Sequence, residues 1–328
     1  MKKLLVLLVL LLVGCGNEEI IEEPNVPSPV VESEISIIDL DSNTRPYIVV
    51  VNNFPSAVKV QTGLQDAYIV YEIPVEGGMT RLLALYKDKT STKIGTVRSA
   101  RHNFLDYALE NDAIFVHFGW SHYAQSDISS LGINSINGLY DAPFWRENKE
   151  NLATEHTAFT SLDKVINTVK NKNYKLTTEK ETLLNYSTKK VDLSEKEDSI
   201  TANEIIIPSS KSLNTTYRYD DVNKNYKRYV NGNANTDYET KEQYTTKNII
   251  VVKVDFKYAS DGYYLDIHNI GSGKGYYITN GYAVPITWEK KDRSSQTIYK
   301  YIDGTEIDVN DGNTYIQFQS NNQELTIK

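Results

Sequence analysis

Two arginines, Arg98 and Arg101, stand where the sequence predicts the start of a helix. The segment GTVRSARHNF (95–104) leads into apolar residues at helical spacing, and Ser99 is of a type that caps helix N-termini. The helix dipole places partial positive charge at this end, which favours acidic side chains rather than arginine. The two guanidinium groups therefore indicate a negative partner, which is either a carboxylate of the chain or a bound anion.

A Glu-Gly-Gly turn at 76–78 precedes a third arginine, Arg81. Adjacent glycines suit a tight hairpin turn, and they would also let backbone N–H groups approach a ligand beside Glu76, a candidate general base. Guanidinium groups bind phosphate or carboxylate through paired hydrogen bonds, so Arg81, Arg98 and Arg101 could hold an external anion. They could equally be neutralised inside the fold. The carboxylates available for this are Glu72, Glu76 and Asp106.

Four of the five histidines fall in the first half of the chain, at positions 102, 117, 122 and 156. His117 ends a predicted strand, where it is either a hydrogen-bonded core residue or a catalytic one. The interval between His117 and His122 is not a familiar zinc spacing and no third ligand can be placed, so no metal is expected. The chain has no GxSxG motif, and GSGKG at 271–275 lacks the spacing of a phosphate loop. No cofactor is expected.

The elements that must position these residues alternate between strands and helices from residue 45 to about 170. Runs rich in β-branched and aromatic residues predict strands at 47–52, 68–75, 81–86 and 113–118. Apolar periodicity predicts helices at 100–110, at 122–131 with Ser121 as the cap, and at 162–170 with Thr160 or Ser161 as the cap. A strand, a helix and a further strand make a crossover unit. The prediction for 45–170 is an α/β domain with a mixed sheet and crossover helices.

The predicted strand ends carry polar residues, and ligands of open α/β sheets bind beyond the carboxyl ends of the strands. Asn53 follows the first strand, the Glu-Gly-Gly turn follows the second, and His117 ends the fourth. If the central strands are parallel, these residues meet at one edge of the sheet. The candidate catalytic residues are Glu76 and His117, and the candidate ligand-binding residues are Asn53, Arg81, Arg98 and Arg101.

The second half of the chain has a different character. Residues 171–200 are polar and charge-dense and predict a connector. Fifteen of the 24 tyrosines then lie between Tyr217 and Tyr315, among repeated Asn-Gly and Asp-Gly turn signals. Short tyrosine-rich strands joined by such turns predict a β-rich domain over 201–328. The tyrosines, with Trp288, could present flat faces to sugars.

The first fifteen residues indicate export. Two lysines precede an apolar run at 4–13, which is too short to span a bilayer because a spanning helix needs about 20 residues, but suits a signal peptide. The run ends in Leu-Val-Gly-Cys, which resembles a lipobox and predicts a signal peptide over 1–15 and acylation, with palmitate for example, at Cys15. Because Cys15 is the only cysteine, no disulfide can form within the chain.

Residues 16–44 are expected to form an acidic tether. They contain three prolines and eight acidic residues, with no lysine or arginine. Such a segment repels itself and stays extended. The tether alone carries eight negative charges, and the net charge of the whole chain is −8, so the rest of the chain is nearly neutral. It therefore lacks the basic field that nucleic-acid binding requires, and no nucleic acid is expected as a partner.

The sequence resembles the YerB-like bacterial lipoproteins over nearly the whole mature chain. The resemblance rests on RPYIVVVNN (45–53), QTGLQDAYIVYEIPVEGGMTRLLALY (61–86), IGTVRSARHNF (94–104), DAIFVHFGWS (112–121), EHTAFTS (155–161), GSGKGYYITNG (271–281) and TWEKKDRSSQTIYKYIDGTEI (287–307). It implies two domains and an exported protein tethered to the outer face of the cytoplasmic membrane, but no residue roles. One departure is Trp120, where a small residue is expected beside Gly119, and this indole could narrow the site.

A weaker likeness concerns the segment from 67 to 86 and the arginines after it, which look similar to the LytR-CpsA-Psr envelope phosphotransferases. In that family arginines hold a lipid pyrophosphate, but its acidic metal ligands cannot be placed here. The leading hypothesis is a lipid-anchored envelope protein that binds a cell-wall glycan or phosphorylated glycan. The alternatives are a phosphotransferase, a glycan-cleaving enzyme with Glu76 as acid and a second carboxylate, and a non-catalytic scaffold that binds an envelope protein through the tyrosine-rich domain.

Overall fold

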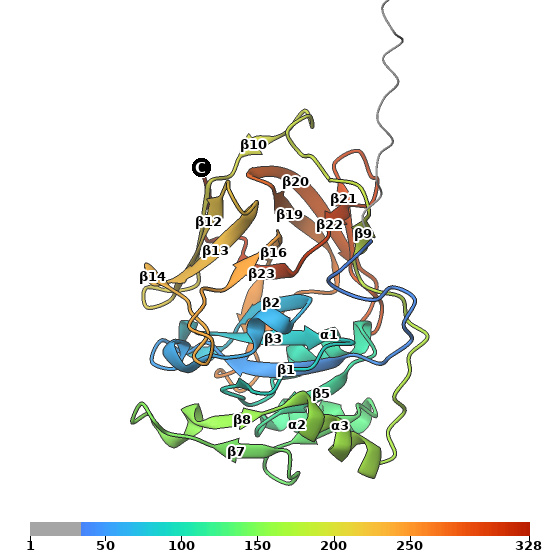
Figure 1. The fold of residues 1–328 in the computed structure, drawn as a ribbon, viewed down its shortest axis with the longest axis vertical. Coiled ribbons are helices and arrows are strands. Elements are labelled where there is room, and N and C mark those ends of the chain that lie inside the picture. Colours follow the sequence, from blue (N-terminus) through green and yellow to red (C-terminus); the bar gives the residue numbers. More distant parts are fainter. Residues whose placement is uncertain (1–33) are drawn as a thin grey trace, which may run out of the picture. The chain divides into compact units, whose positions relative to one another are not determined.

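An eleven-stranded mixed sheet forms the centre of the fold (Figure 1). The computed structural model describes residues 34–328, which belong to one compact unit, Ser33–Lys328. The predicted signal peptide, Cys15 and most of the acidic segment therefore lie outside the described residues. The strands of the main sheet, in chain order, are β1 (Tyr47–Asn52), β2 (Ile69–Pro74), β3 (Thr80–Tyr86), β5 (Ile114–His117), β6 (Ser135–Asn137), β10 (Ile200–Thr201), β16 (Asn248–Val254), β19 (Gly271–Thr279), β20 (Tyr282–Lys290), β21 (Ile298–Tyr301) and β23 (Thr314–Ser320).

Smaller sheets and a few short helices surround this centre. A six-stranded sheet contains β11 (Glu204–Pro208), β12 (Asn214–Asp220), β13 (Asn225–Val230), β14 (Asn233–Ala234), β15 (Thr245–Thr246) and β24 (Thr326–Ile327). The minor pairings involve β4 (Ile94–Gly95), β7 (Phe144–Arg146), β8 (Ala158–Thr160), β9 (Asn185–Ser187), β22 (Asp308–Asn310), β17 (Phe256–Tyr258) and β18 (Leu265–Ile267). The α-helices are α1 (Leu105–Glu110), α2 (His122–Ser130) and α3 (Leu162–Asn171), and the 3-10 turns are η1 (Val58–Val60), η2 (Leu64–Asp66), η3 (Glu76–Gly78), η4 (His102–Phe104) and η5 (Thr154–His156).

The fold class predicted from the sequence is confirmed. An α/β region with a mixed sheet is followed by a β-rich region, and both contribute to the main sheet. Its strand order is β10-β20-β19-β16-β23-β2-β3-β1-β5-β6, with β21 beside β20. The two regions meet where β2 pairs in parallel with β23, so that Ile69 lies opposite Thr314.

Two hydrophobic cores lie on opposite faces of this sheet, as the alternation of side chains along a strand requires. In β1, Ile48 and Val50 point into one core, which α1 and α2 cover, and Val49 and Val51 point into the other. The second core is covered by α3 and by the six-stranded sheet, through residues such as Val165. Both faces are buried, and this explains why the central strands are continuously apolar rather than alternating.

The predicted start of the first helix at residue 100 is wrong: helical structure begins with η4 at His102, two residues later, and α1 begins at Leu105. Residues 98–101 are extended, and the chain becomes helical only at η4. The backbone N–H of Arg98 donates to Val50 O in β1, and that of Ala100 donates to Gly119 O. Pairing with these neighbours holds Ser99 in extended structure, so it caps nothing. The other predicted caps are confirmed, because Ser121 and Ser161 accept hydrogen bonds from the first turns of α2 and α3.

Part of the polar chain between the two regions packs on the folded body. Within 171–200, Leu184 and Leu193 are buried in the first core. Before β1, the N–H groups of Ser36 and Ile37 donate to the Asp311 carboxylate at 3.0–3.1 Å. The charged residues and prolines of these stretches predicted a connector and an extended tether. Their few apolar residues decide where these stretches pack on the folded body.

Candidate functional site

The strand ends that carry the candidate residues meet at one edge of the sheet, as expected. Strand β1 runs parallel to β5 and antiparallel to β3, and β2 and β3 form a hairpin. In this register Arg81 lies between Asn52 and Ile73. The carboxyl ends of β1, β2 and β5 and the start of β3 therefore share an edge, which we call the arginine edge. It contains Glu76, Arg81, Arg98 and Arg101.

Glu76 is the negative partner of Arg101. The Nε atom of Arg101 donates to Glu76 Oε2 at 2.9 Å, and its Nη2 atom donates to Oε1. The two side chains are only 14% and 10% exposed. Burial would raise the pKa of Glu76, but the hydrogen bonds and charge of Arg101, with the charge of Arg81, outweigh it and lower the pKa. Glu76 is thus held as a carboxylate.

Arg81 is less well compensated than Arg101. Its side chain is 7% exposed, and its Nη2 atom lies 3.7 Å from the Glu76 carboxylate that Arg101 already binds. Its Nη1 atom donates to the carbonyl oxygen of Ser99. Burial, followed by the charge of Arg101, lowers the pKa of Arg81 well below its ordinary value. Two buried guanidinium groups therefore share one carboxylate.

Arg98 adds a third positive charge to the same edge. Its Nη1 atom donates to the backbone oxygen of Glu155 at 3.1 Å, and its Nε atom is buried without a partner among the described residues. Burial lowers the pKa of Arg98, the charge of Glu155 opposes this, and the charge of Arg101 adds to it. Arg98 thus brings unused hydrogen-bonding capacity to this edge.

Asn53 lies next to this edge in sequence but bonds into a different network. Its Nδ2 atom donates to Glu72 Oε1 at 3.0 Å and to Thr80 Oγ1 at 2.7 Å, and its Oδ1 atom accepts from Gln61 at 3.0 Å. Asn53 and Glu72 are both buried. Its amide is therefore occupied within the fold, apart from the three arginines.

His117 is a buried neutral imidazole. Its Nδ1 atom lies 2.8 Å from Gly119 O and must donate to it, which leaves Nε2 as an acceptor without a partner among residues 34–328. The ring lies between Phe115 and Trp120, with centroid distances of 5.1 and 5.7 Å. Burial lowers the pKa of His117 to about 4. Trp120, the departure noted in the sequence, thus covers this histidine.

The depressed pKa of His117 predicts a pH-dependent stability. Between pH 6.5 and 4 the unfolded chain binds a proton at this histidine and the folded chain does not, so stability falls as the pH falls. The loss is complete near pH 4 and amounts to about 3 kcal/mol. Urea unfolding from pH 7 to 4 should show a shallower decline for His117→Gln than for the unchanged protein. If the stability of His117→Gln and of the unchanged protein declines equally with falling pH, the lowered pKa of His117 is not the cause of the decline.

Aromatic side chains flank the arginine edge. The Arg101 guanidinium lies 5.0 Å from the centre of the Tyr264 ring, between β17 and β18. Tyr264 also packs edge-on against Tyr123 of α2 and against Tyr263, which is 59% exposed. His102, which stacks edge-on against Tyr123, is itself bonded to Asp266 in β18 at 2.8 Å. The edge thus combines positive charge with exposed aromatic surface.

Within residues 34–328, no group of three or more histidine, cysteine, aspartate or glutamate side chains is arranged to hold a metal ion. The two histidines considered for zinc have other contacts. His117 is bonded to Gly119 O, and the His122 Nε2 atom lies 3.8 Å from Asp261.

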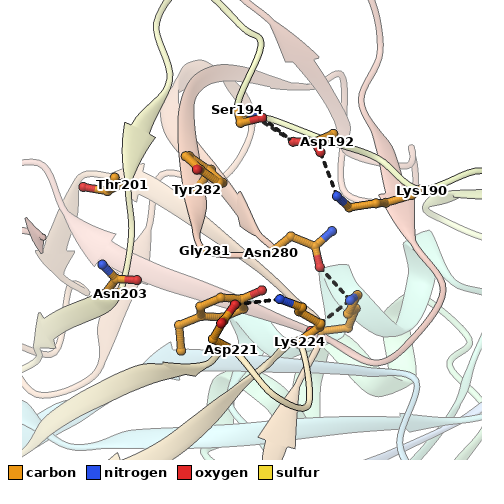
Figure 2. Close-up of a pocket in the computed structure, with 12 residues that line it drawn as sticks. Lys190, Asp192, Ser194, Thr201, Asn203, Asp221, Lys224, Asn280, Gly281 and Tyr282 are labelled. Carbon is orange, nitrogen blue, oxygen red and sulfur yellow. Dashed lines mark hydrogen bonds and ion pairs between the residues drawn. The ribbon is translucent and has the colours of Figure 1, made fainter.

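Sequence reasoning missed an open cleft of about 740 Å³ in the C-terminal half of the chain (Figure 2). It lies between the connector, the β12–β13 turn and the β19–β20 turn, and its lining includes Lys190, Lys224, Lys247, Tyr219 and Tyr282. These residues are distant in sequence and follow no motif. The Asn-Gly turn at 280–281 was the only local signal, and it indicated a turn rather than a binding site.

Comparison with known proteins places most of the described chain in one family. Residues 36–175 match the model described as "Protein of unknown function (DUF3048) N-terminal domain", and residues 205–316 match its C-terminal domain. The Putative lipoprotein YerB of Bacillus subtilis (strain 168) is 32% identical over 248 residues, which are 75% of this chain and 73% of that protein. The chain belongs to the DUF3048 family.

The crystal structure of the YerB protein from Bacillus subtilis has the same fold as this DUF3048 protein. The TM-score is 0.75 at 30% identity, over 87% of this chain and 94% of that one. The resemblance to the YerB-like lipoproteins is thereby confirmed. No helix among residues 34–328 is long and apolar enough to cross a membrane.

Proposed function

We propose that this DUF3048 protein is anchored through acylated Cys15 on the outer face of the cytoplasmic membrane and binds an anionic cell-wall glycan at the arginine edge. The lipobox-like sequence and the name of its lipoprotein relative support the anchor. They also agree with an exported location, where the protein would meet cell-wall glycans.

The observation that carries the proposal is an imbalance of buried charge. Among residues 34–328, Arg81 and Arg101 share the carboxylate of Glu76, and half-buried Arg98 forms no ion pair, although the charge of Glu155 acts on it. Burial of a charge that is incompletely paired is costly. A phosphate or carboxylate group of a ligand would supply the missing negative charge and the acceptor for Arg98 Nε. The neighbouring Tyr263 and Tyr264 offer faces on which a sugar ring can stack.

Glycan cleavage by Glu76 is less well supported than binding. A general acid needs a raised pKa, so that it carries a proton near neutral pH. The pKa of Glu76 is lowered, and both of its oxygens accept hydrogen bonds from Arg101. Phosphotransfer would use the same arginines to stabilise charge on phosphate, and it remains a second use of this edge.

The binding proposal is tested with Arg98→Gln in the full-length chain, purified in detergent. N-acetylglucosamine 1-phosphate is the probe in isothermal titration calorimetry, and N-acetylglucosamine is its uncharged counterpart. We expect the phosphate sugar to bind the unchanged protein and Arg98→Gln to weaken binding at least about tenfold, since a hydrogen bond to a charged group contributes about 1.5–3 kcal/mol.

Lys170→Gln is the matched control, because it removes one exposed positive charge from the end of α3. It should bind like the unchanged protein. If neither sugar binds, or if Arg98→Gln binds as tightly as the control, the arginine edge is a structural network. A protein captured by the 201–328 region would then favour the scaffold hypothesis.

A further inference from the structure

The open cleft in the C-terminal half gathers three lysines from three separate parts of the chain. Lys190 comes from the connector, Lys224 from the β12–β13 turn, and Lys247 from the position just before β16. In Figure 2, Lys190 and Lys224 lie on different sides of the Asn280–Gly281 turn, and dashed lines join them to Asp192 and Asp221. No single segment of sequence carries this positive charge, and only the fold assembles it.

Two hydrogen bonds hold the ammonium group of Lys247 in place within this cluster. Its Nζ atom donates to Asn280 Oδ1 at 2.7 Å and to the backbone oxygen of Lys224 at 2.8 Å. It forms no ion pair with a carboxylate of the described chain. Burial, and then the charges of Lys190 and Lys224, lower the pKa of Lys247, and the charge of Asp311 opposes them. A half-buried ammonium group without a carboxylate partner is thus oriented by two neutral acceptors.

The other two lysines have weak local partners. Lys190 pairs with Asp192 at 2.7 Å, and Lys224 pairs with Asp221 at 2.6 Å. All four side chains are exposed, and exposed ion pairs contribute little to stability, so a ligand can replace either pair at small cost. The cleft therefore keeps an excess positive charge at Lys247 and two further ammonium groups that can turn toward a ligand.

The remaining lining can bind the uncharged part of a ligand. Half-buried Tyr219 and Tyr282 supply aromatic surface, and Ser194, Thr201 and Asn203 supply hydrogen-bonding groups. A cleft of about 740 Å³ falls in the range of about 300–1,000 Å³ that small-molecule sites occupy. Its concave shape suits a segment of a chain better than a flat lipid surface.

We propose that this cleft binds the phosphate groups of a phosphorylated glycan or polyol chain, as a second site separate from the arginine edge. Lysine binds phosphate as a point charge, without the planar fork that arginine presents to a carboxylate. Three ammonium groups around one cleft fit a ligand with more than one phosphate. Tyrosine and hydroxyl groups fit the sugar or polyol that links the phosphates.

The test uses inorganic tripolyphosphate and the full-length chain in detergent, with binding followed by calorimetry at two salt concentrations. We expect Lys247→Gln and Lys190→Gln each to weaken binding, with Lys247→Gln losing about tenfold and flattening the salt dependence. Lys170→Gln, the matched control outside the cleft, should bind like the unchanged protein. Any tripolyphosphate binding that Arg98→Gln weakens belongs to the arginine edge. The loss caused by Lys247→Gln is therefore also measured on an Arg98→Gln background, so this site and the proposed function can fail separately.

The outcomes separate the sources of phosphate. Tighter binding of oligomeric glycerol phosphate than of tripolyphosphate would support a polyol chain as the ligand. Equal binding by Lys247→Gln and the unchanged protein would overturn the proposal, and so would equal losses in Lys247→Gln and Lys170→Gln. If Lys190→Gln and Lys247→Gln reduce binding only to phosphatidylglycerol vesicles, the cleft contacts the membrane surface and the polymer hypothesis is wrong.

Discussion

Arg228→Met should lower the free energy of unfolding by about 3–5 kcal/mol, because it leaves the buried Glu72 carboxylate without its counter-charge. The Nη2 atom of Arg228 lies 2.9 Å from Glu72 Oε2, and the two side chains are 0% and 2% exposed. The other carboxylate oxygen accepts hydrogen bonds from Asn53, Thr80 and Thr215. None of these neutral donors replaces a full positive charge. Urea denaturation of the purified variant measures the loss.

The matched control is Arg218→Met on the neighbouring strand β12. Arg218 pairs with Glu204 at 2.8 Å, but its side chain is 51% exposed, so the same substitution should lower the stability far less than Arg228→Met does. The double variant Glu72→Gln with Arg228→Met should be more stable than Arg228→Met alone, since it removes the orphaned charge. A loss for Arg228→Met no larger than for Arg218→Met would show that water reaches the pair.

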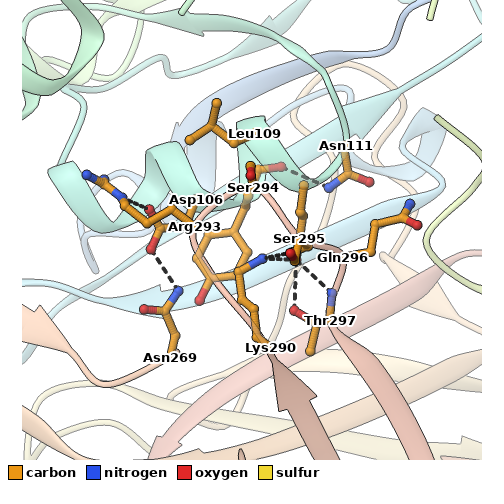
Figure 3. Close-up of polar contacts among 12 residues, drawn as sticks. Asp106, Leu109, Asn111, Asn269, Lys290, Arg293, Ser294, Ser295, Gln296 and Thr297 are labelled. Atoms are coloured by element: carbon orange, nitrogen blue, oxygen red, sulfur yellow. Dashed lines mark hydrogen bonds and ion pairs between the residues drawn. The ribbon is translucent and has the colours of Figure 1, made fainter. Parts of the chain in front are cut away.

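Glu110→Gln is expected to destabilise the protein by a similar amount, about 3–5 kcal/mol, by leaving Lys290 buried and uncompensated. The two side chains are 0% and 1% exposed, and Lys290 Nζ lies 2.7 Å from Glu110 Oε2. The same oxygen accepts from Thr297 Oγ1 at 2.7 Å, and the other accepts from the Tyr71 hydroxyl at 2.9 Å. Figure 3 shows Lys290 and Thr297 converging from the ends of the loop that joins β20 to β21.

The comparison is a change of one exposed charge on β20, the strand that contains Lys290. Glu289→Gln removes the partner of Lys300, whose Nζ atom lies 2.6 Å from the Glu289 carboxylate, and Glu289 is half exposed. We expect this change to cost about 0–1 kcal/mol in the same urea experiment. If Glu110→Gln and Glu289→Gln unfold at the same urea concentration, the buried Glu110–Lys290 pair does not stabilise the contact between α1 and β20.

Both buried pairs join the region of the N-terminal family domain to that of the C-terminal domain. Glu72 lies in β2 and Arg228 in β13, and Glu110 lies in α1 and Lys290 in β20. Arg293, in the loop after β20, adds an ion pair with Asp106 of α1 at 2.5 Å (Figure 3). Since removal of one member of a buried pair is strongly destabilising, these contacts hold the two regions together. We therefore expect them to unfold in one transition.

The local elements were predictable because their signals are local. The strand 47–52 was predicted with the bounds that β1 has, and Ser121 and Ser161 cap the helices that they precede. The start of the first helix was not predictable, because extended pairing of residues 98–101 with β1 and Gly119 overrides the capping preference of Ser99. Tertiary hydrogen bonds outweighed a local propensity there.

The arginine edge was predictable in membership but not in its bonding. Residue types and strand order placed Glu76, Arg81, Arg98 and Arg101 together. Only the structure decided that Glu76 binds Arg101 most closely, that Arg98 Nε has no partner within residues 34–328, and that Asn53 bonds to Glu72 instead. Differences of one or two ångströms decide which of several carboxylates an arginine reaches, and spacing along the chain does not contain that information.

By itself, the sequence determined that the chain resembles a lipoprotein family and that its first region is α/β, and it predicted one edge for Glu76 and three arginines on the condition that the central strands are parallel. Tertiary structure alone decided that the two regions share a sheet and that Lys190, Lys224 and Lys247 line one cleft. The physical reason is the range of the interactions. Helix caps, turns and strand patterns depend on neighbours along the chain, but a cleft and a buried ion pair depend on distant segments that packing brings together.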